Sequence, residues 1–156
     1  MRKNTVKITV IALFAAVISA GMFTPIDGYT FSLFSRYTSV EDNNGEVRID
    51  VGKVSDGKAH YYSYQDGKQT IKFFIVKSPD GVIRAAFDAC DVCFHAKKGY
   101  KQEGDLMICN NCGMKFHSNR VNVVEGGCNP APLKRQQVGG QLVIKVADIL
   151  PGKRFF

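Results

Sequence analysis

The stretch CDVCFHAKKGYKQEGDLMICNNC, residues 90–112, determines what kind of functional site this chain can form. It holds two CxxC pairs, Cys90 with Cys93 and Cys109 with Cys112, separated by 15 residues. Each CxxC forms a tight loop that presents two sulfurs, and a hairpin of this length lets the second loop return to face the first. The spacing therefore predicts a ribbon-like hairpin whose four thiolates converge on a tetrahedral metal, with sulfur–metal distances of about 2.3 Å.

A fifth cysteine and a glycine bear on the same site. Gly113 directly follows the second pair, and a residue free to adopt a positive φ eases a loop that turns backbone N–H groups toward sulfur. Cys128 comes after a second gap of 15 residues, in the sharp Gly-Gly-Cys-Asn-Pro turn of residues 126–130. Its sulfur could join the site, complete a second site, or fill a buried position as a small hydrophobic group. Cys128 is therefore a candidate ligand whose role the sequence leaves open.

Two histidines and two aspartates flank the cysteines. His95 and His117 lie two and five residues beyond their CxxC pairs, and imidazole binds the same metals. Most such neighbouring histidines are exposed, so both are secondary candidates. Asp88 and Asp91, on either side of Cys90, are expected to make turn hydrogen bonds. The sequence has no nucleophile beside a base, no Gly-rich phosphate loop and no paired carboxylates, so no catalytic residue is predicted.

The residues before the first CxxC indicate β structure. Four segments are rich in β-branched and aromatic residues: VRIDV (47–51), AHYYSY (59–64), TIKFFIV (70–76) and VIRAAF (82–87). The turn dipeptides Asp66-Gly67 and Asp80-Gly81 join the last three, which predicts an antiparallel meander that leads straight into Cys90. A short strand at 106–108 and a final strand at 141–146 follow. The expected fold is mainly β, a small antiparallel domain with the metal site at one end.

The N-terminus indicates a membrane or export segment. Nineteen uncharged residues, 8–26, follow the basic lead MRKNTVK, and a helix of that length spans about 28 Å. We interpret residues 1–27 as a signal anchor, a single transmembrane helix, with a cleaved signal peptide as the alternative because Ile18-Ser19-Ala20 is a possible cleavage site. Residues 28–45 are then a linker, and 46–156 a Cys-rich metal-binding β domain. Either interpretation places that domain on the extracytoplasmic side, because basic residues stay inside.

The charge of the chain does not favour nucleic acid as a partner. The formal net charge is +7, but Arg2, Lys3 and Lys7 precede the apolar segment. The other basic residues are scattered among Asp and Glu rather than gathered on one stripe, and bound thiolates would lower the charge further. We therefore expect contact with the membrane through the N-terminal helix and no nucleic-acid binding.

Disulfides and thiol exchange are the alternatives to metal. Disulfides form in exported domains, but five cysteines leave one unpaired, and a bond within a CxxC is typically a reducible, catalytic one. Thioredoxin-like CxxC pairs open a helix whose N-terminus lowers the thiol pKa, and neither pair here precedes a helical pattern. Metal binding is therefore the preferred interpretation, with an extracytoplasmic thiol–disulfide oxidoreductase kept as an alternative.

Four segments together resemble a known family: AFDACDVC, KKGYKQEGD, CNNCGMKF and GGCNPAPL. This combination, over residues 46–156, resembles the membrane iron–sulfur protein family called FtrD-like. The resemblance implies a membrane-attached, exported iron–sulfur protein with Cys90, Cys93, Cys109, Cys112 and Cys128 as its cysteine set. It also implies a role as an electron carrier, in some members with iron-permease systems, and hence a redox or iron-transport partner protein.

Three hypotheses follow for the function. The first is an electron-transfer component, not an enzyme in itself, in which the five cysteines hold an iron–sulfur cluster or mononuclear iron. The second is a non-enzymatic, zinc-ribbon-like binding module with a structural zinc, and the third is the thiol oxidoreductase. Two CxxC pairs match zinc ribbons and mononuclear iron sites better than the bacterial ferredoxin run, and spacing does not decide between zinc and iron.

Overall fold

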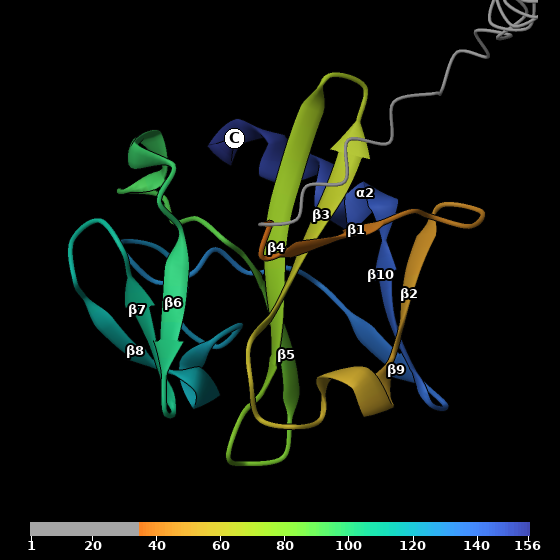
Figure 1. Cartoon of the computed structure of the whole chain (residues 1–156), viewed down its shortest axis with the longest axis horizontal. Coiled ribbons are helices and arrows are strands. Elements are labelled where there is room, and N and C mark those ends of the chain that lie inside the picture. The colour runs from red at the N-terminus through yellow and green to blue at the C-terminus, as the bar shows by residue number, and fades with distance from the viewer. Residues whose placement is uncertain (1–34) are drawn as a thin grey trace, which may run out of the picture. The chain divides into compact units, whose positions relative to one another are not determined.

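The computed structural model describes residues 35–156, which form three small β-sheets (Figure 1). The first, sheet A, has the strand order β1-β3-β4-β5. Its strands are β1 (Tyr37–Val40), β3 (His60–Asp66), β4 (Gln69–Lys77) and β5 (Ile83–Phe87). Sheet B is β2 (Glu46–Asp50), β10 (Gln141–Lys145) and β9 (Gln136–Val138), and sheet C is β6 (Tyr100–Glu103), β7 (Leu106–Cys109) and β8 (Lys115–His117). The prediction of a mainly β fold is confirmed.

Sheet A contains the predicted meander. β3 and β4 pair in antiparallel fashion around the turn at Gly67, whose φ is +59°, and β4 pairs with β5 around a turn in which the N–H of Gly81 donates to the carbonyl of Ser78. β1 lies parallel to β3 at the edge of the sheet. Residues 37–40 were expected within the 28–45 linker, and in the structure they belong to sheet A.

Strand β4 is buried on both faces, and this places sheet A between the other two sheets. Ile71, Phe73 and Ile75 point into one core, which also contains side chains from β2 and β10 of sheet B. Phe74 and Val76 point into a second, smaller core with side chains from β6 and β7 of sheet C. Alternate residues of a strand face opposite sides, so a near-continuous apolar run is what a central strand covered on both faces requires. Figure 1 shows β6–β8 on one side of β4 and β2, β9 and β10 on the other.

Sheet C is the predicted ribbon-like hairpin. β6 and β7 pair so that Tyr100 lies opposite Cys109, and Gly104, at φ +56°, provides the turn between them. The sequence indicated the strand at 106–108 but not β8, which adds a third strand by pairing Met107 with Phe116. The hairpin therefore brings the second CxxC back toward the first, which follows β5.

Sheet B and the C-terminus close the larger core. The predicted strand at 47–51 corresponds to β2, which pairs with β10 rather than with the meander, with Val47 opposite Ile144. The short helices are η1 (Val51–Val54), η2 (Phe94–Ala96), η3 (Ser118–Arg120), α2 (Val146–Ile149) and η4 (Leu150–Phe155). Within residues 35–156, no helix has the length and hydropathy that crossing a membrane requires. The predicted N-terminal helix, residues 1–27, lies outside the described part of the chain.

Candidate metal centre

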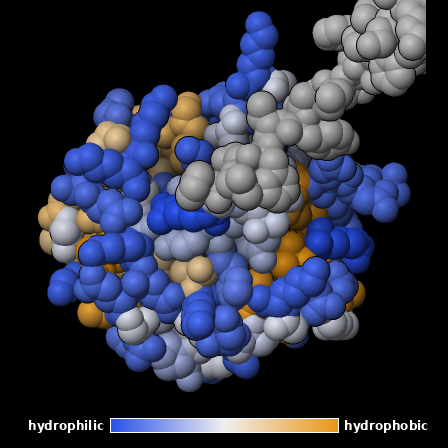
Figure 2. Space-filling model, viewed as in Figure 1, coloured by the Kyte–Doolittle hydropathy of each residue, from blue (hydrophilic) through white to orange (hydrophobic). Residues whose placement is uncertain are grey.

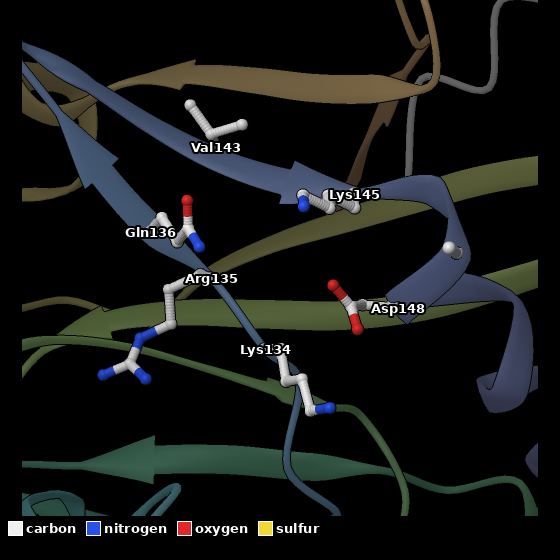
Figure 3. Close-up of a pocket in the computed structure, with 7 residues that line it drawn as sticks. Lys134, Arg135, Gln136, Val143, Lys145 and Asp148 are labelled. Carbon is white, nitrogen blue, oxygen red and sulfur yellow. The ribbon is translucent and has the colours of Figure 1, made fainter.

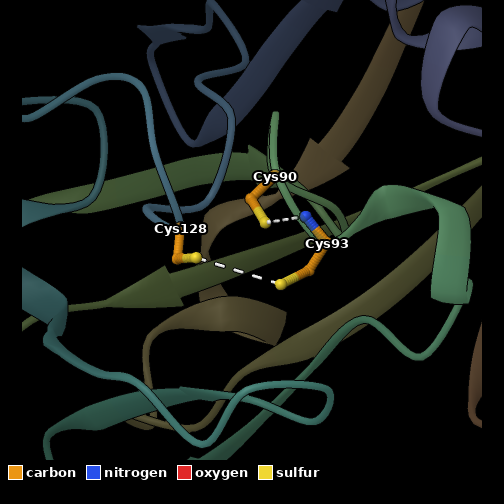
Figure 4. A group of neighbouring side chains, drawn as sticks. All are labelled: Cys90, Cys93 and Cys128. Carbon is orange, nitrogen blue, oxygen red and sulfur yellow. Dashed lines mark hydrogen bonds between the residues drawn. The ribbon is translucent and has the colours of Figure 1, made fainter.

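The five cysteines come together from three separate loops beside the smaller core. Cys90 and Cys93 follow the end of β5, Cys109 is the last residue of β7, Cys112 lies in the turn after it, and Cys128 belongs to the loop between η3 and β9. Figure 4 shows Cys90, Cys93 and Cys128 facing one another across two of these loops. The side chains that the CxxC spacing predicts to converge do converge, and Cys128 lies with them. Ligation of a metal by these sulfurs remains a prediction that the geometry permits.

The sulfur atoms form two groups of three. Cys90, Cys93 and Cys128 make one group and Cys93, Cys109 and Cys112 make the other, and within each group the sulfurs lie within 4.8 Å of one another. The Sγ atoms of Cys93 and Cys128 are 3.9 Å apart. All five cysteines are free thiols, so the described chain has no disulfide.

The backbone of both CxxC loops has a geometry that suits metal binding by the cysteine sulfurs. In the first loop the N–H of Cys93 lies 3.2 Å from Cys90 Sγ and donates to it (Figure 4). In the second loop Gly113 adopts a φ of +74°, and its N–H donates to the carbonyl of Cys109 over 2.9 Å. N–H groups directed at sulfur stabilise the thiolate that a metal binds. Only the three-residue helix η2 follows Cys93, so neither pair begins a helix of the thioredoxin kind.

Burial divides the sulfurs into inner and outer members. Cys90 and Cys109 are buried, Cys93 and Cys128 are partly buried, and Cys112 is exposed. A hydrogen bond from Asn111, helped by the neighbouring thiols, lowers the pKa of Cys93 to about 7. Burial raises the pKa of Cys109 to about 11. Burial and the adjacent thiols raise the pKa of Cys128 to about 12. Without a metal, Cys93 is therefore ionised well before Cys109 and Cys128, and a bound cation is what would deprotonate those two at neutral pH.

Tyr100 connects the hairpin to the Cys128 loop. Its ring is buried between Phe74 and Phe116, with centroid separations of 6.3 and 6.4 Å. Its hydroxyl donates to the carbonyl oxygen of Cys128 over 2.6 Å. Burial raises the pKa of Tyr100 far above its usual value, so the hydroxyl keeps its proton and the hydrogen bond persists. This bond holds the Cys128 loop in place, where the sulfur of Cys128 lies close to those of Cys90 and Cys93.

Asp88, expected from the sequence to make turn hydrogen bonds, instead supports the first CxxC through bonds to residues far along the chain. The carboxylate is buried and accepts hydrogen bonds from the hydroxyl of Tyr37 at 2.5 Å and from the N–H of Tyr100 at 2.7 Å, and it pairs with the guanidinium of Arg36. Burial raises the pKa of Asp88, and these partners oppose that shift. Gly99, at φ +63°, leaves room for the carboxylate, because a Cβ there would overlap it. Asp88 is therefore a structural anchor between β5 and the hairpin.

Arg36 completes this anchor from the N-terminal side. Its Nη1 donates to the carbonyl of Tyr100 over 2.7 Å, and its guanidinium carbon lies 4.0 Å from the ring centroid of Tyr61. The Tyr61 hydroxyl donates to the same carbonyl over 3.1 Å. The sequence did carry a signal for the network, because an aspartate that ends the buried strand of residues 83–87 needs a partner. It did not reveal which distant residues supply one.

The histidines take other roles. His95 is exposed and its ring lies 3.8 Å from that of Phe94, centroid to centroid. His117 is also exposed, and its Nδ1 accepts from the N–H of Asn119 at the start of η3. His60 faces Asp56. Within residues 35–156, none of the three belongs to a group of potential metal ligands.

The hollows of the surface do not indicate a substrate site at the sulfurs. A cavity of about 480 Å³ lies at sheet B and α2, with a lining that includes Lys134, Arg135, Lys145 and Asp148 but no cysteine (Figure 3). The hollow that contacts Cys90, Cys93 and Cys109 measures only about 10 Å³. That volume holds roughly one water molecule. Among the described residues, this hollow therefore has room for a single ion or water molecule beside the sulfurs.

The fold and the site define a small β protein with a candidate thiolate metal centre, and sequence comparison gives its family. The family model described as "Membrane iron-sulfur containing protein FtrD-like" matches residues 54–156, about two thirds of the chain. The chain belongs to this family, as the resemblance of its cysteine segments predicted.

Comparison with curated proteins gives no match. Among solved structures, the chain is similar to a crystal structure of the quaternary ammonium Rieske monooxygenase CntA in complex with the inhibitor MMV12. The identity is 16%, the TM-score is 0.41, and the match covers 64% of this chain. The chain spans about 30% of the length of that monooxygenase.

Proposed function

We propose that this protein is a membrane-anchored electron carrier whose extracytoplasmic β domain holds iron on its cysteine thiolates. The iron is present as an iron–sulfur cluster or as iron ions. The observation that carries the proposal is the convergence of five free thiols, from three loops, into two groups of sulfurs that share Cys93. Membership of a membrane iron–sulfur family supports iron as the metal. A link to iron transport rests on the same family resemblance.

The donor set fits this kind of centre. Thiolates are the ligands of iron–sulfur clusters and of soft or borderline metal ions. Iron held by thiolates supplies a one-electron change of oxidation state. The chain contributes rigid loops, the N–H donor to Cys90 and a buried Tyr100 that fixes Cys128, and these features keep the ligands in place in both oxidation states.

An electron carrier also fits the surroundings of the sulfurs better than an enzyme does. The hollow at the inner sulfurs is too small for an organic substrate, whereas Cys112 reaches the surface. Electrons can pass through an exposed ligand without a binding pocket. On the face shown in Figure 2, polar and charged residues cover most of the described surface and apolar residues form separate patches. That surface is compatible with a domain that stands in water beside a membrane.

The sidedness of the proposal follows from charge. Arg2, Lys3 and Lys7 precede the uncharged segment 8–26, and such residues favour the cytoplasmic side. In intact cells that express the chain, a membrane-impermeant thiol reagent should label a cysteine introduced at exposed Val138 in a variant that retains its metal centre. Labelling only after the membrane is opened would place the domain on the cytoplasmic side.

The metal is tested by purifying the full chain from membranes without oxygen. We expect iron in stoichiometric amounts, a coloured visible spectrum that bleaches reversibly on reduction, and loss of both in Cys109→Ser. His117→Ala is the matched control, because this exposed side chain lies outside the sulfur groups, and it should keep the spectrum. A colourless protein with stoichiometric zinc and no iron would contradict the proposal.

A structural zinc is the second candidate. The loop after Cys109 favours it, since a glycine at positive φ and an N–H directed at the carbonyl of the first cysteine form a knuckle of the zinc-ribbon kind. With zinc the protein shows no redox change, and Cys109→Ser unfolds sheet C rather than altering a colour.

A further inference from the structure

The arrangement of the sulfur atoms bears on why the chain has five cysteines, when one tetrahedral metal site needs four. In a single tetrahedral site with sulfur–metal distances of about 2.3 Å, all four sulfurs lie about 3.8 Å from one another. Four cysteines would then form one mutually close group. The described sulfurs instead form two groups of three, and Cys93 belongs to both.

We propose that the centre holds two metal ions that share the thiolate of Cys93. Cys90 and Cys128 supply the other two thiolates to one ion, and Cys109 and Cys112 supply them to the other, so each ion has three protein sulfur ligands. The inference rests on the proposed function in one respect, that these thiolates bind metal. It applies to zinc and to iron ions bound directly by thiolate, because it concerns which sulfurs surround each ion.

The position of Cys93 fits a shared ligand. Figure 4 shows it opposite Cys128 and next to Cys90, and its Sγ also lies within 4.8 Å of the sulfurs of Cys109 and Cys112. A thiolate sulfur has more than one lone pair and can therefore bind two cations at once. Cys90 and Cys128 lie in one group of sulfurs and Cys109 and Cys112 in the other, and Cys93 is the member common to both.

Charge supports two ions rather than one. If all five cysteines bind as thiolates, a single divalent cation leaves three uncompensated negative charges within a few ångströms, at a site where two of the sulfurs are buried. Like charges this close repel strongly in a medium of low dielectric. A second divalent cation reduces the uncompensated charge to one negative charge. The exposed position of Cys112 places that charge near water.

The test counts ions on the metal-free, reduced full chain. Cd²⁺ is the probe, because its thiolate complexes absorb in the ultraviolet and it prefers sulfur ligands. We expect the absorbance to rise linearly to a break at two equivalents in the native chain. Cys112→Ser should break at one equivalent, since the group of Cys90, Cys93 and Cys128 remains intact. Cys93→Ser should lose tight binding of both ions, and His95→Ala should keep two.

The opposite results are equally clear. A break at one equivalent in the native chain, or two equivalents retained in Cys93→Ser, would overturn the shared thiolate. A variant that fails to fold is recognised by circular dichroism and set aside, and the native chain then decides alone. Loaded with ¹¹³Cd, it should give two resonances split by mutual coupling through the common sulfur. Two unsplit resonances or a single one would overturn the proposal.

This experiment is separate from the test of the proposed function. Iron content and colour are measured on the protein as purified, whereas Cd²⁺ stoichiometry is measured on the metal-free chain. If the purified protein contains no iron but binds two coupled Cd²⁺ ions, the electron-carrier proposal fails and the shared thiolate stands. If it contains iron but binds a single Cd²⁺ ion, the electron-carrier proposal stands and the shared thiolate fails.

Discussion

Asp88 lies two residues before Cys90, and three different residues direct their donors at its buried carboxylate. A buried charge strongly destabilises the fold unless its hydrogen-bond and ion-pair partners remain in place. Arg36 is about a third exposed, so the pair is partly screened by water. The value of the network lies mainly in the fixed position that it gives to the strand end and to the hairpin of sheet C.

Asp88→Asn tests this anchor. The neutral amide cannot pair with Arg36 and places an N–H₂ group near one of the donors, so we expect a loss of about 1 to 3 kcal/mol in the free energy of unfolding. Bound metal should also be released faster to a chelator. Urea unfolding and the chelator rate measure the two effects.

The control is Glu46→Gln, which breaks an exposed pair with Arg48 on sheet B. It should change stability by less than about 1 kcal/mol and leave metal release unaltered. Equal release rates in Asp88→Asn and the native chain would show that the anchor has no influence on the centre.

Cys93 gives a second prediction at this scale. Its pKa is lowered to about 7, so in the metal-free chain the reactive thiolate increases as the pH rises through 7 and is nearly complete at pH 8. The rate of alkylation by iodoacetamide should follow that curve. Cys109 and Cys128, whose pKa values are raised to about 11 and 12, should react slowly at pH 8. Mass spectrometry of peptides from chains treated at several pH values measures each site, and a Cys93 midpoint near pH 9 would contradict the prediction.

At the scale of elements, strand β4 separates two cores that have different tasks. Phe73 packs in the larger core between sheets A and B, where its ring stacks on Tyr62 at a centroid distance of 5.6 Å. Phe74, the next residue, packs in the smaller core against Tyr100 and near the buried cysteines. The same strand thus carries one side chain that supports the general fold and one that supports the candidate centre.

This pair allows a matched comparison. Phe73→Ala and Phe74→Ala each remove a fully buried ring, and each should cost about 3 to 5 kcal/mol in the free energy of unfolding. Only Phe74→Ala should accelerate metal release under conditions where the variant remains folded, because it loosens the packing of Tyr100. Similar release rates in the two variants would show that the cores are not independent in this respect.

The elements also show what the sequence can predict. The meander of β3, β4 and β5 was predictable because each turn is encoded locally, by Asp66-Gly67 and by residues 78–81. The partner of β2 was not, because β10 lies almost a hundred residues further along the chain and no local pattern selects it. The four cysteines of the two CxxC pairs were predictable from spacing alone. The place of Cys128 depends on the Tyr100 hydroxyl, and that of Asp88 on Arg36, both contacts between distant residues.

At the scale of the described domain, the smaller core depends on the sulfurs themselves. Cys90 and Cys109 are members of it, together with Tyr100, Met107 and Phe74. The larger core has more residues and includes no cysteine. Removal of a bound metal therefore takes away support from one side of the domain only.

Hydrogen exchange after treatment with a chelator should reveal this difference. Backbone amides of β6 and β7 are expected to lose protection by at least about tenfold, which corresponds to about 1.4 kcal/mol of local stability. Amides of β2 and β10 should keep theirs. The metal-loaded chain under the same conditions is the control, and uniform loss of protection in all three sheets would show that the domain responds as one unit.

Among the five sulfurs, only that of Cys112 belongs to an exposed residue. A peroxide molecule diffusing from outside therefore reaches this atom before it reaches the buried ones, and oxidation of a ligand to sulfenic acid would begin there. If the centre carries electrons as proposed, the exposed ligand through which they would leave is also the first site of oxidative damage to the protein.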